Sequence, residues 1–140
     1  MIDRLALPSA LSVQILRAAR AAAPQECCGL IEGIRRGKDA RATALYPAHN
    51  LSPHVGRFEI DPQDHFDALR GARARGQAII GCYHSHPHGQ AKPSQTDLAG
   101  AGEEDFLWLI AAGGRLAAFV YSRGGFSVVA TGADLVTSSS

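Results

Sequence analysis

The sequence predicts a single α+β domain in which a mixed β-sheet is flanked by a few helices. Three observations support this prediction. The chain has 140 residues, which suits one domain with its own hydrophobic core. Two segments carry apolar residues at helical spacing, whereas several short apolar runs bounded by turn residues are typical of strands. Without any internal repeat or linker, we expect the domain to cover residues 1–136, followed by a flexible polar tail at 137–140.

The first predicted helix covers residues 9–22. Leu11 and Ile15 lie on one side at helical spacing, and the segment is rich in alanine, which favours the helical conformation. We expect Ser9 to cap the N-terminus, and Pro24 lies just past the end.

Three strands are expected in the first half of the sheet. Residues 26–33 and 41–46 are predicted to form a hairpin across the charged turn at 35–39. A loop at 47–56, which contains two prolines, leads to a short strand at 57–60.

The second predicted helix begins at Pro62 and ends near Gly76. Asp61 is the expected N-cap, and proline is favoured at the first helical position. Its apolar stripe is expected to consist of Phe66, Leu69 and Ala72.

The second half of the chain contains four more predicted strands and one short helix. The strand at 77–83 is followed by a loop rich in glycine and proline, and then by a helix from Ser94 to about Gly102. Glycine pairs separate the last three strands, which are expected at 106–112, 116–122 and 126–130.

Composition excludes several classes of function. The formal net charge is +1, so no large field attracts nucleic acid or a membrane surface. The chain lacks both a long apolar run and the layout of a secretory signal. Its three cysteines do not form a disulfide framework. We therefore expect a cytoplasmic protein with no nucleic acid or membrane partner.

The densest group of reactive side chains lies between positions 84 and 97. Residues two apart on a strand face the same side, so His84 and His86 are expected to meet at the end of the strand at 77–83. Zinc is commonly held by three such ligands with a fourth position open, and Asp97 is the natural third ligand. Glu26 is the best candidate for a catalytic base.

Plainer interpretations compete with this one. Ser94 and Asp97 have the spacing of a capping box, which is compatible with Asp97 also facing an ion. Cys82 shares the strand face with the histidines, but packing explains it better than metal binding. Whether Cys82 or the loop residue His88 contributes to the site stays open.

The combination of Glu26, the segment His84-Ser85-His86, and Ser94 followed by Asp97 resembles the signature of the JAMM (MPN+) metalloproteases, also called the Mov34/MPN/PAD-1 family. Asn50 and the segment 57–62 resemble the compact prokaryotic members. The similarity covers nearly the whole chain, and the motif positions show no departure from the family pattern.

This resemblance implies a cytidine-deaminase-like α/β/α sandwich that binds Zn²⁺ through His84, His86 and Asp97. It also implies that Glu26 acts as general acid and base and that Ser94 donates a hydrogen bond near the oxyanion. Family members cleave peptide or isopeptide bonds, often behind the C-terminal glycines of ubiquitin-like proteins. The implied substrate is the tail of a ubiquitin-like or sulfur-carrier protein.

Two alternatives are considered beside this leading hypothesis. One is a cell-wall or phage-type peptidase, although such enzymes usually carry a partner domain. The other is a non-catalytic MPN-type scaffold, although scaffold members generally lack part of the ligand set that this chain retains. The oligomeric state is not predicted, and a homodimer is one option.

Overall fold

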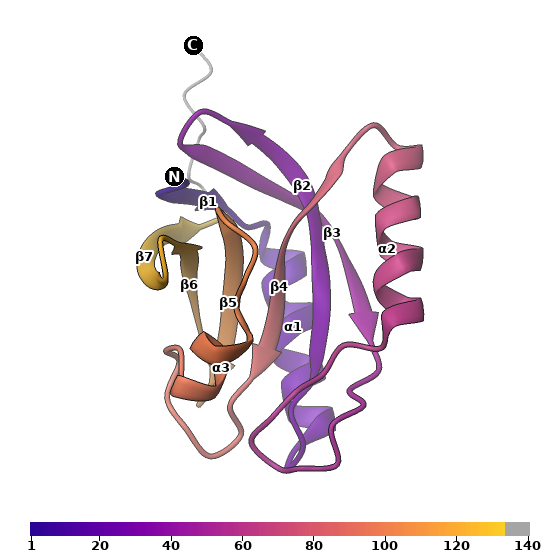
Figure 1. The fold of residues 1–140 in the computed structure, drawn as a ribbon, viewed down its shortest axis with the longest axis vertical. Coiled ribbons are helices and arrows are strands. Elements are labelled where there is room, and N and C mark those ends of the chain that lie inside the picture. The colour runs from indigo at the N-terminus through magenta and orange to yellow at the C-terminus, as the bar shows by residue number, and fades with distance from the viewer. Residues whose placement is uncertain (134–140) are drawn as a thin grey trace.

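The computed structural model describes residues 1–133, and Figure 1 shows the order of its elements. The helices are α1 (Ser9–Ala22), α2 (Pro62–Ala74) and α3 (Gln95–Gly100). The strands are β1 (Arg4–Ala6), β2 (Cys28–Arg36), β3 (Asp39–Ala48), β4 (Ala78–Ser85), β5 (Phe106–Ala112), β6 (Arg115–Ser122) and β7 (Gly125–Gly132). The predicted domain end at 136 and the predicted tail at 137–140 lie outside the described residues.

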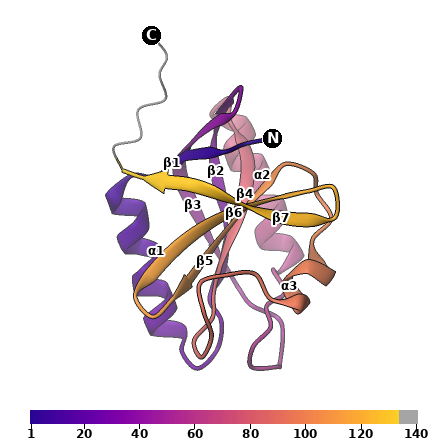
Figure 2. The same ribbon diagram turned by 90° about the vertical axis from the view of Figure 1, so that its left-hand side faces the viewer.

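The strands form one mixed sheet in the order β1-β3-β2-β4-β5-β6-β7. β1 pairs in parallel with both β3 and β7, which closes the sheet into a barrel (Figure 2). β4 and β5 are also parallel, and the other neighbours are antiparallel. The predicted mixed sheet with a few helices is confirmed. The closure of the sheet through β1 was not predicted, because a strand of three residues is too short to show the alternation of apolar and polar residues that marks a strand.

β4 lies in the middle of the molecule, with α1 and α2 on opposite sides (Figure 1). Tyr83 belongs to a buried cluster that contains Ile15 of α1, whereas Cys82 belongs to a second cluster that contains Ala68 and Ala72 of α2. Successive residues of a strand face opposite sides, so both faces of β4 are covered. The strand is therefore a rigid support for the residues at its end.

Most helix and strand predictions are confirmed, with differences of a few residues at the ends. α1 spans the predicted range, but its N-cap is Pro8, which makes no side-chain cap hydrogen bond, so the assignment of Ser9 as the cap was wrong. Asp61 does cap α2, since its carboxylate accepts a hydrogen bond from the Gln63 N–H.

Two predictions fail for physical reasons. Residues 57–60 form no strand beyond a single bridge between Asn50 and Ile60. The Asn50 side chain instead hydrogen-bonds the Arg57 carbonyl and the Glu59 N–H, which a strand would pair with a neighbouring strand. The stripe expected on α2 is wrong at two of its three members, since Phe66 is 54% exposed and Leu69 is 48% exposed, whereas Ala72 is buried as predicted. Ala68 joins the predicted Ala72 on the face toward the sheet, because their small side chains allow the helix to approach it closely.

Among residues 1–133, no helix combines the length and the apolar character that a membrane-spanning segment requires.

Candidate metal centre

The two imidazoles come from the end of β4. His84 is fully buried in the strand, and His86 follows directly after its last residue. The His86 N–H donates to the Ala111 carbonyl (2.8 Å), which continues the pairing of β4 with β5 beyond the strand. The two Nε2 atoms lie 3.0 Å apart. The predicted convergence of the two side chains is therefore present in the structure.

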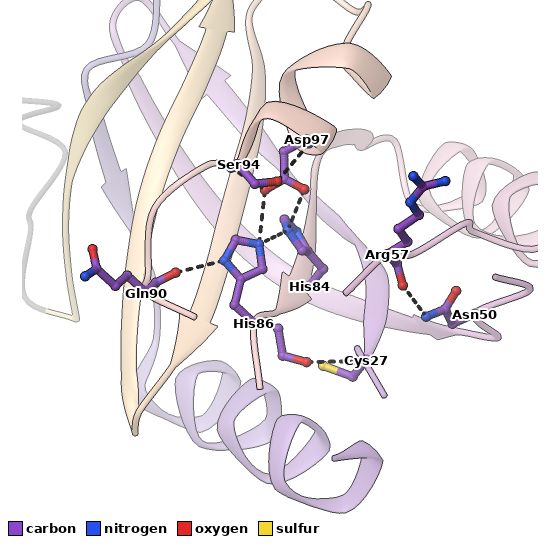
Figure 3. Close-up of polar contacts among 9 residues, drawn as sticks. Cys27, Asn50, Arg57, His84, His86, Gln90, Ser94 and Asp97 are labelled. Carbon is purple, nitrogen blue, oxygen red and sulfur yellow. Dashed lines mark hydrogen bonds and ion pairs between the residues drawn. The ribbon is translucent and has the colours of Figure 1, made fainter. Parts of the chain in front are cut away.

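Asp97 approaches these imidazoles from the first turn of α3. Ser94 and Asp97 form a capping box, in which Ser94 Oγ accepts from the Asp97 N–H and the Ser94 N–H donates to Asp97 Oδ2, both at 3.0 Å. The same carboxylate places Oδ1 3.1 Å from His84 Nε2 and Oδ2 3.1 Å from His86 Nε2 (Figure 3). The helix cap and the contact with the imidazoles coexist, because the cap fixes the carboxylate at the imidazole pair.

The imidazole nitrogens and carboxylate oxygens at this centre suit a metal cation. His86 Nδ1 donates to the Gln90 carbonyl (2.8 Å), so a neutral ring carries its proton on Nδ1. Nε2 then has a lone pair, which points toward Asp97 Oδ2. A lone pair and a carboxylate oxygen at 3.1 Å repel each other unless positive charge lies between them. A second proton on the ring or a metal ion supplies that charge. Two imidazole nitrogens and one carboxylate, with one ring held by a backbone carbonyl, are a typical zinc ligand set.

The pKa values of Asp97 and His84 suit this role, whereas that of His86 shifts in the opposite direction. Burial raises the pKa of Asp97, but its hydrogen bonds with His84 and His86 outweigh that effect and hold the pKa below its usual range. Burial lowers the pKa of His84, which keeps its ring neutral, whereas the hydrogen bond with Asp97 raises the pKa of His86.

Glu26 faces the same centre from the segment before β2. The antiparallel register pairs Cys28 with His84, so its continuation places Glu26 opposite His86. A carboxylate oxygen of Glu26 and one nitrogen of each imidazole all lie within 4.8 Å of one another. The Glu26 side chain is 4% exposed, and Oε1 has no hydrogen-bond partner among the described residues. Burial raises its pKa to about 7, with His86 opposing the rise and Asp97 adding to it.

An aromatic wall supports His84. The Phe58 ring stacks on the imidazole with centroids 4.3 Å apart, and Trp108 meets the imidazole edge-on at 5.7 Å. Both aromatic residues line a hollow of about 310 Å³ that also reaches Asp97 and the buried Cys82. The site therefore combines a polar centre with an adjoining apolar surface.

The remaining candidates from the sequence lie in different surroundings. The Cys82 side chain packs in the apolar cluster beneath α2, and His88 is exposed in the loop after β4. A second group lies elsewhere, where the ring of His49 is 2.8 Å from Asp64 at the start of α2. Asp61, beside this pair, is already used as the cap of α2. This second group is the weaker candidate for a metal, because His49 is exposed and Asp61 already caps α2.

Sequence reasoning also missed Ser85 and Phe58. Ser85 lies between the two histidines, and that position was the one signal that pointed to it. Phe58 gave no signal of its own, because its contact with His84 spans 26 residues of chain.

Residues 8–123 match the family described as prokaryotic homologs of the JAB domain. A desampylase of Haloferax volcanii is 35% identical over 115 residues, which cover 77% of this chain and 80% of the relative. A probable TtuB-protein conjugate cleaving protease of Thermus thermophilus is 32% identical over 77 residues, which cover 54% of this chain and 49% of the relative.

The fold is similar to the solution structure of a protein from Desulfitobacterium hafniense. The TM-score is 0.82 at 29% sequence identity, and the match covers 91% of this chain and 90% of the other. Every residue of the candidate centre lies within the range that the family match covers.

Proposed function

This chain belongs to the prokaryotic JAB-domain homologues and is a peptidase of the JAMM type, and on that premise we propose that it is zinc-dependent. Its substrate is an amide bond at the C-terminal tail of a ubiquitin-like or sulfur-carrier protein. One observation carries the proposal: three side chains meet at 3.0–3.1 Å beside a buried carboxylate, one oxygen of which has no hydrogen-bond partner within residues 1–133.

His84, His86 and Asp97 are the proposed zinc ligands. When bound, zinc supplies a Lewis acid that polarises the amide carbonyl and lowers the pKa of a coordinated water to about 7. The protein positions its ligands by rigid means, since β4 is buried on both faces and Asp97 is fixed in a capping box. Positions fixed in this way reduce the reorganisation needed when the ion binds.

Glu26 is the proposed general acid and base. A carboxyl whose pKa is about 7 exists in both protonation states at neutral pH. It can therefore accept a proton from the attacking water and return it to the departing amine. Its Oε1 is the atom proposed to hold this proton, because no group among the described residues competes for it.

Ser94 is the proposed hydrogen-bond donor to the developing oxyanion. Its oxygen accepts from the Asp97 N–H, which leaves the hydroxyl proton available for a substrate. Ser94 is exposed, so an approaching carbonyl can reach it. Losing a donor of this kind typically costs about 10²–10³ in rate.

The substrate proposal draws on the relatives. Their names refer to desampylase activity and to cleavage of TtuB-protein conjugates, and an extended carrier tail suits an open site at the end of a strand. The peptidase assignment sets aside the scaffold alternative. A cytoplasmic location remains part of the proposal and is supported by the free thiols of Cys27, Cys28 and Cys82.

The test combines metal analysis with a cleavage assay. The probe is a carrier protein ending in two glycines, extended by one amino acid or joined to a lysine side chain. We expect about one zinc per chain, cleavage of at least one probe, and loss of cleavage after chelation that added zinc restores. Asp97→Ala is expected to lose both zinc and cleavage.

Asp64→Ala is the matched control, because it removes an aspartate that contacts the exposed His49 rather than the central histidines. It is expected to keep zinc and activity. Full zinc occupancy in Asp97→Ala contradicts the ligand assignment. A zinc-loaded protein that leaves both carrier probes intact but cleaves a cell-wall peptide contradicts the proposed substrate.

A further inference from the structure

The backbone that carries Glu26 lies outside the regular sheet. Residues 26 and 27 precede the first residue of β2 and follow the turn after α1. A catalytic carboxylate needs a position accurate to about 0.5 Å. Something other than the strand ladder must therefore fix this segment.

The hydroxyl of Ser85, the last residue of β4, holds the N–H side of the Glu26–Cys27 peptide group. The Cys27 N–H donates to Ser85 Oγ at 2.9 Å, and the Ser85 N–H donates back to the Cys27 carbonyl at 3.2 Å. Ser85 is 1% exposed and lies between the two histidines on β4. Its side chain therefore ties the Glu26 segment to the strand that carries the metal ligands.

An amide from the loop after β3 holds the other side of the same peptide group. Asn50 Nδ2 donates to the Glu26 carbonyl at 3.0 Å. It also donates to the Arg57 carbonyl at 3.1 Å (Figure 3). Asn50 Oδ1 accepts from the N–H groups of Ser52 and Glu59, both at 2.9 Å. A side-chain amide offers two donor protons and two acceptor lone pairs, so Asn50 uses its full capacity.

The loop that Asn50 organises also carries Phe58, whose ring stacks on His84. One side chain thus connects the Glu26 backbone to the residue that packs against a metal ligand. A peptide group fixed at its carbonyl by Asn50 and at its N–H by Ser85 has little freedom to rotate. Rotation of this group would swing the Glu26 side chain away from the imidazoles.

We propose that Ser85 and Asn50 are positioning residues that clamp the Glu26–Cys27 peptide and thereby hold the Glu26 carboxylate over the imidazole pair. The inference rests on the proposed function, in which Glu26 transfers the proton. Neither residue needs to touch substrate or zinc to act in this way. A displacement of about 1 Å at a catalytic group can cost about 10²-fold in rate.

The kinetic test uses the zinc-loaded protein with the carrier probe. Ser85→Ala and Asn50→Asp are each expected to lower kcat by about 10–100-fold while KM and zinc content stay unchanged. Asn50→Asp keeps both acceptor bonds to the loop but loses the donors to Glu26 and Arg57. Ser85→Thr retains the hydroxyl, and the hollow between Ala23 and Ala111 leaves room for its methyl group, so most of kcat returns.

A double-mutant cycle separates positioning from a general structural effect. If the clamp acts through Glu26, Ser85→Ala causes no further loss of kcat in the Glu26→Gln background. Ser52→Ala is the control for the loop, because in the described part of the chain its hydroxyl bonds to His54 alone, and it leaves kcat unchanged. An equal loss in both backgrounds, or loss of zinc from Ser85→Ala, overturns the proposal.

Amide hydrogen exchange of zinc-free protein, followed by NMR, gives a readout independent of turnover. The Cys27 amide is expected to be protected in the native chain and to lose protection in Ser85→Ala, while amides of β5 keep theirs. An unprotected Cys27 amide in the native chain overturns the clamp even if the enzyme is active. A protected amide in a protein that cleaves no carrier probe supports the clamp and overturns the proposed function.

Discussion

Two buried carboxylates, one just before β2 and one within it, have opposite surroundings. Glu26 precedes β2 and Glu32 lies within it, and both are almost fully buried, at 4% and 1% exposure. Oε1 of Glu26 has no hydrogen-bond partner among the described residues. The carboxylate of Glu32 contacts the Arg75 guanidinium and accepts from the Tyr46 hydroxyl at 2.6 Å.

The pKa values of the two groups follow these surroundings. Burial raises the pKa of Glu26 to about 7, because too little positive charge lies near enough to offset it. Burial also acts to raise the pKa of Glu32, but the hydrogen bonds from Arg75 and Tyr46 outweigh it, so this pKa is lowered. Burial by itself does not mark a catalytic acid. The partners decide whether a buried carboxyl can exchange a proton or only stabilises the fold.

The largest expected effect comes from neutralising Glu26. Glu26→Gln is expected to lower kcat by about 10²–10⁴-fold, because proton transfer is lost while zinc binding remains. Its free energy of unfolding should not fall, since the substitution removes a buried carboxylate whose Oε1 has no partner in the described structure. Single-turnover cleavage of the carrier probe, zinc analysis and urea unfolding measure the three quantities.

Glu32→Gln is the matched control for this substitution. It makes the same chemical change six positions further along the chain, and we expect lower stability with an unchanged kcat. Retained turnover in Glu26→Gln, or a comparable loss of turnover in Glu32→Gln, would remove the functional distinction between the two carboxylates.

A smaller effect is expected from removing the cation beside Glu32. Arg75→Met keeps much of the apolar stem but leaves the buried carboxylate without its charged partner. We expect the free energy of unfolding at pH 7 to fall, because a buried carboxylate loses its cation, but only modestly, because Arg75 is half exposed and Tyr46 still donates. Urea unfolding measures this loss, and zinc content and kcat should not change. Undiminished stability would mean that Tyr46 alone satisfies Glu32.

The smallest effect is a difference in how stability depends on pH in the zinc-free protein. Glu26 binds its proton more tightly in the folded state, so its contribution to stability falls as pH rises from about 4.5 to about 7. Glu32 binds its proton less tightly when folded, so its contribution is present above the unfolded pKa, 4.5, and is lost as pH falls through the lower folded value.

Urea unfolding at pH 5, 6 and 7 measures these opposite slopes. Subtracting the curve of Glu26→Gln from that of the native chain should leave a difference that favours the native chain at pH 5 relative to pH 7. A flat difference would show that the Glu26 carboxyl titrates at its ordinary pKa when zinc is absent.

Local sequence rules identified most elements of the fold and the members of the centre. Residues close together in the sequence were enough to predict three features. These are the helix at residues 9–22, the cap at Asp61 and the strand before His84. The spacing of His84, His86 and Asp97 indicated a shared metal, and the structure brings their ligand atoms to 3.0–3.1 Å. The assignment of zinc and of the catalytic roles remains a prediction.

Long-range contacts were out of reach of those rules. The exposure of Phe66 and the burial of Ala68 depend on how closely α2 approaches the sheet. The closure of the sheet by β1 depends on two partners, one of them more than 120 residues away in the sequence. The stacking of Phe58 on His84 and the bonds of Asn50 likewise join segments without a common local pattern.

The sequence by itself determined which donor groups this protein has, in what order, and on which kinds of element they lie, because these properties depend on neighbouring residues. The tertiary structure decided how Glu26 meets His86, since that meeting depends on the register that sets Cys28 against His84. It also decided that the carboxylate of Glu32 is paired with the Arg75 guanidinium, whereas the carboxyl of Glu26 lacks enough positive charge nearby to offset its burial. The charge and hydrogen bonds around a buried carboxyl come from distant parts of the chain, which only the packed fold brings together.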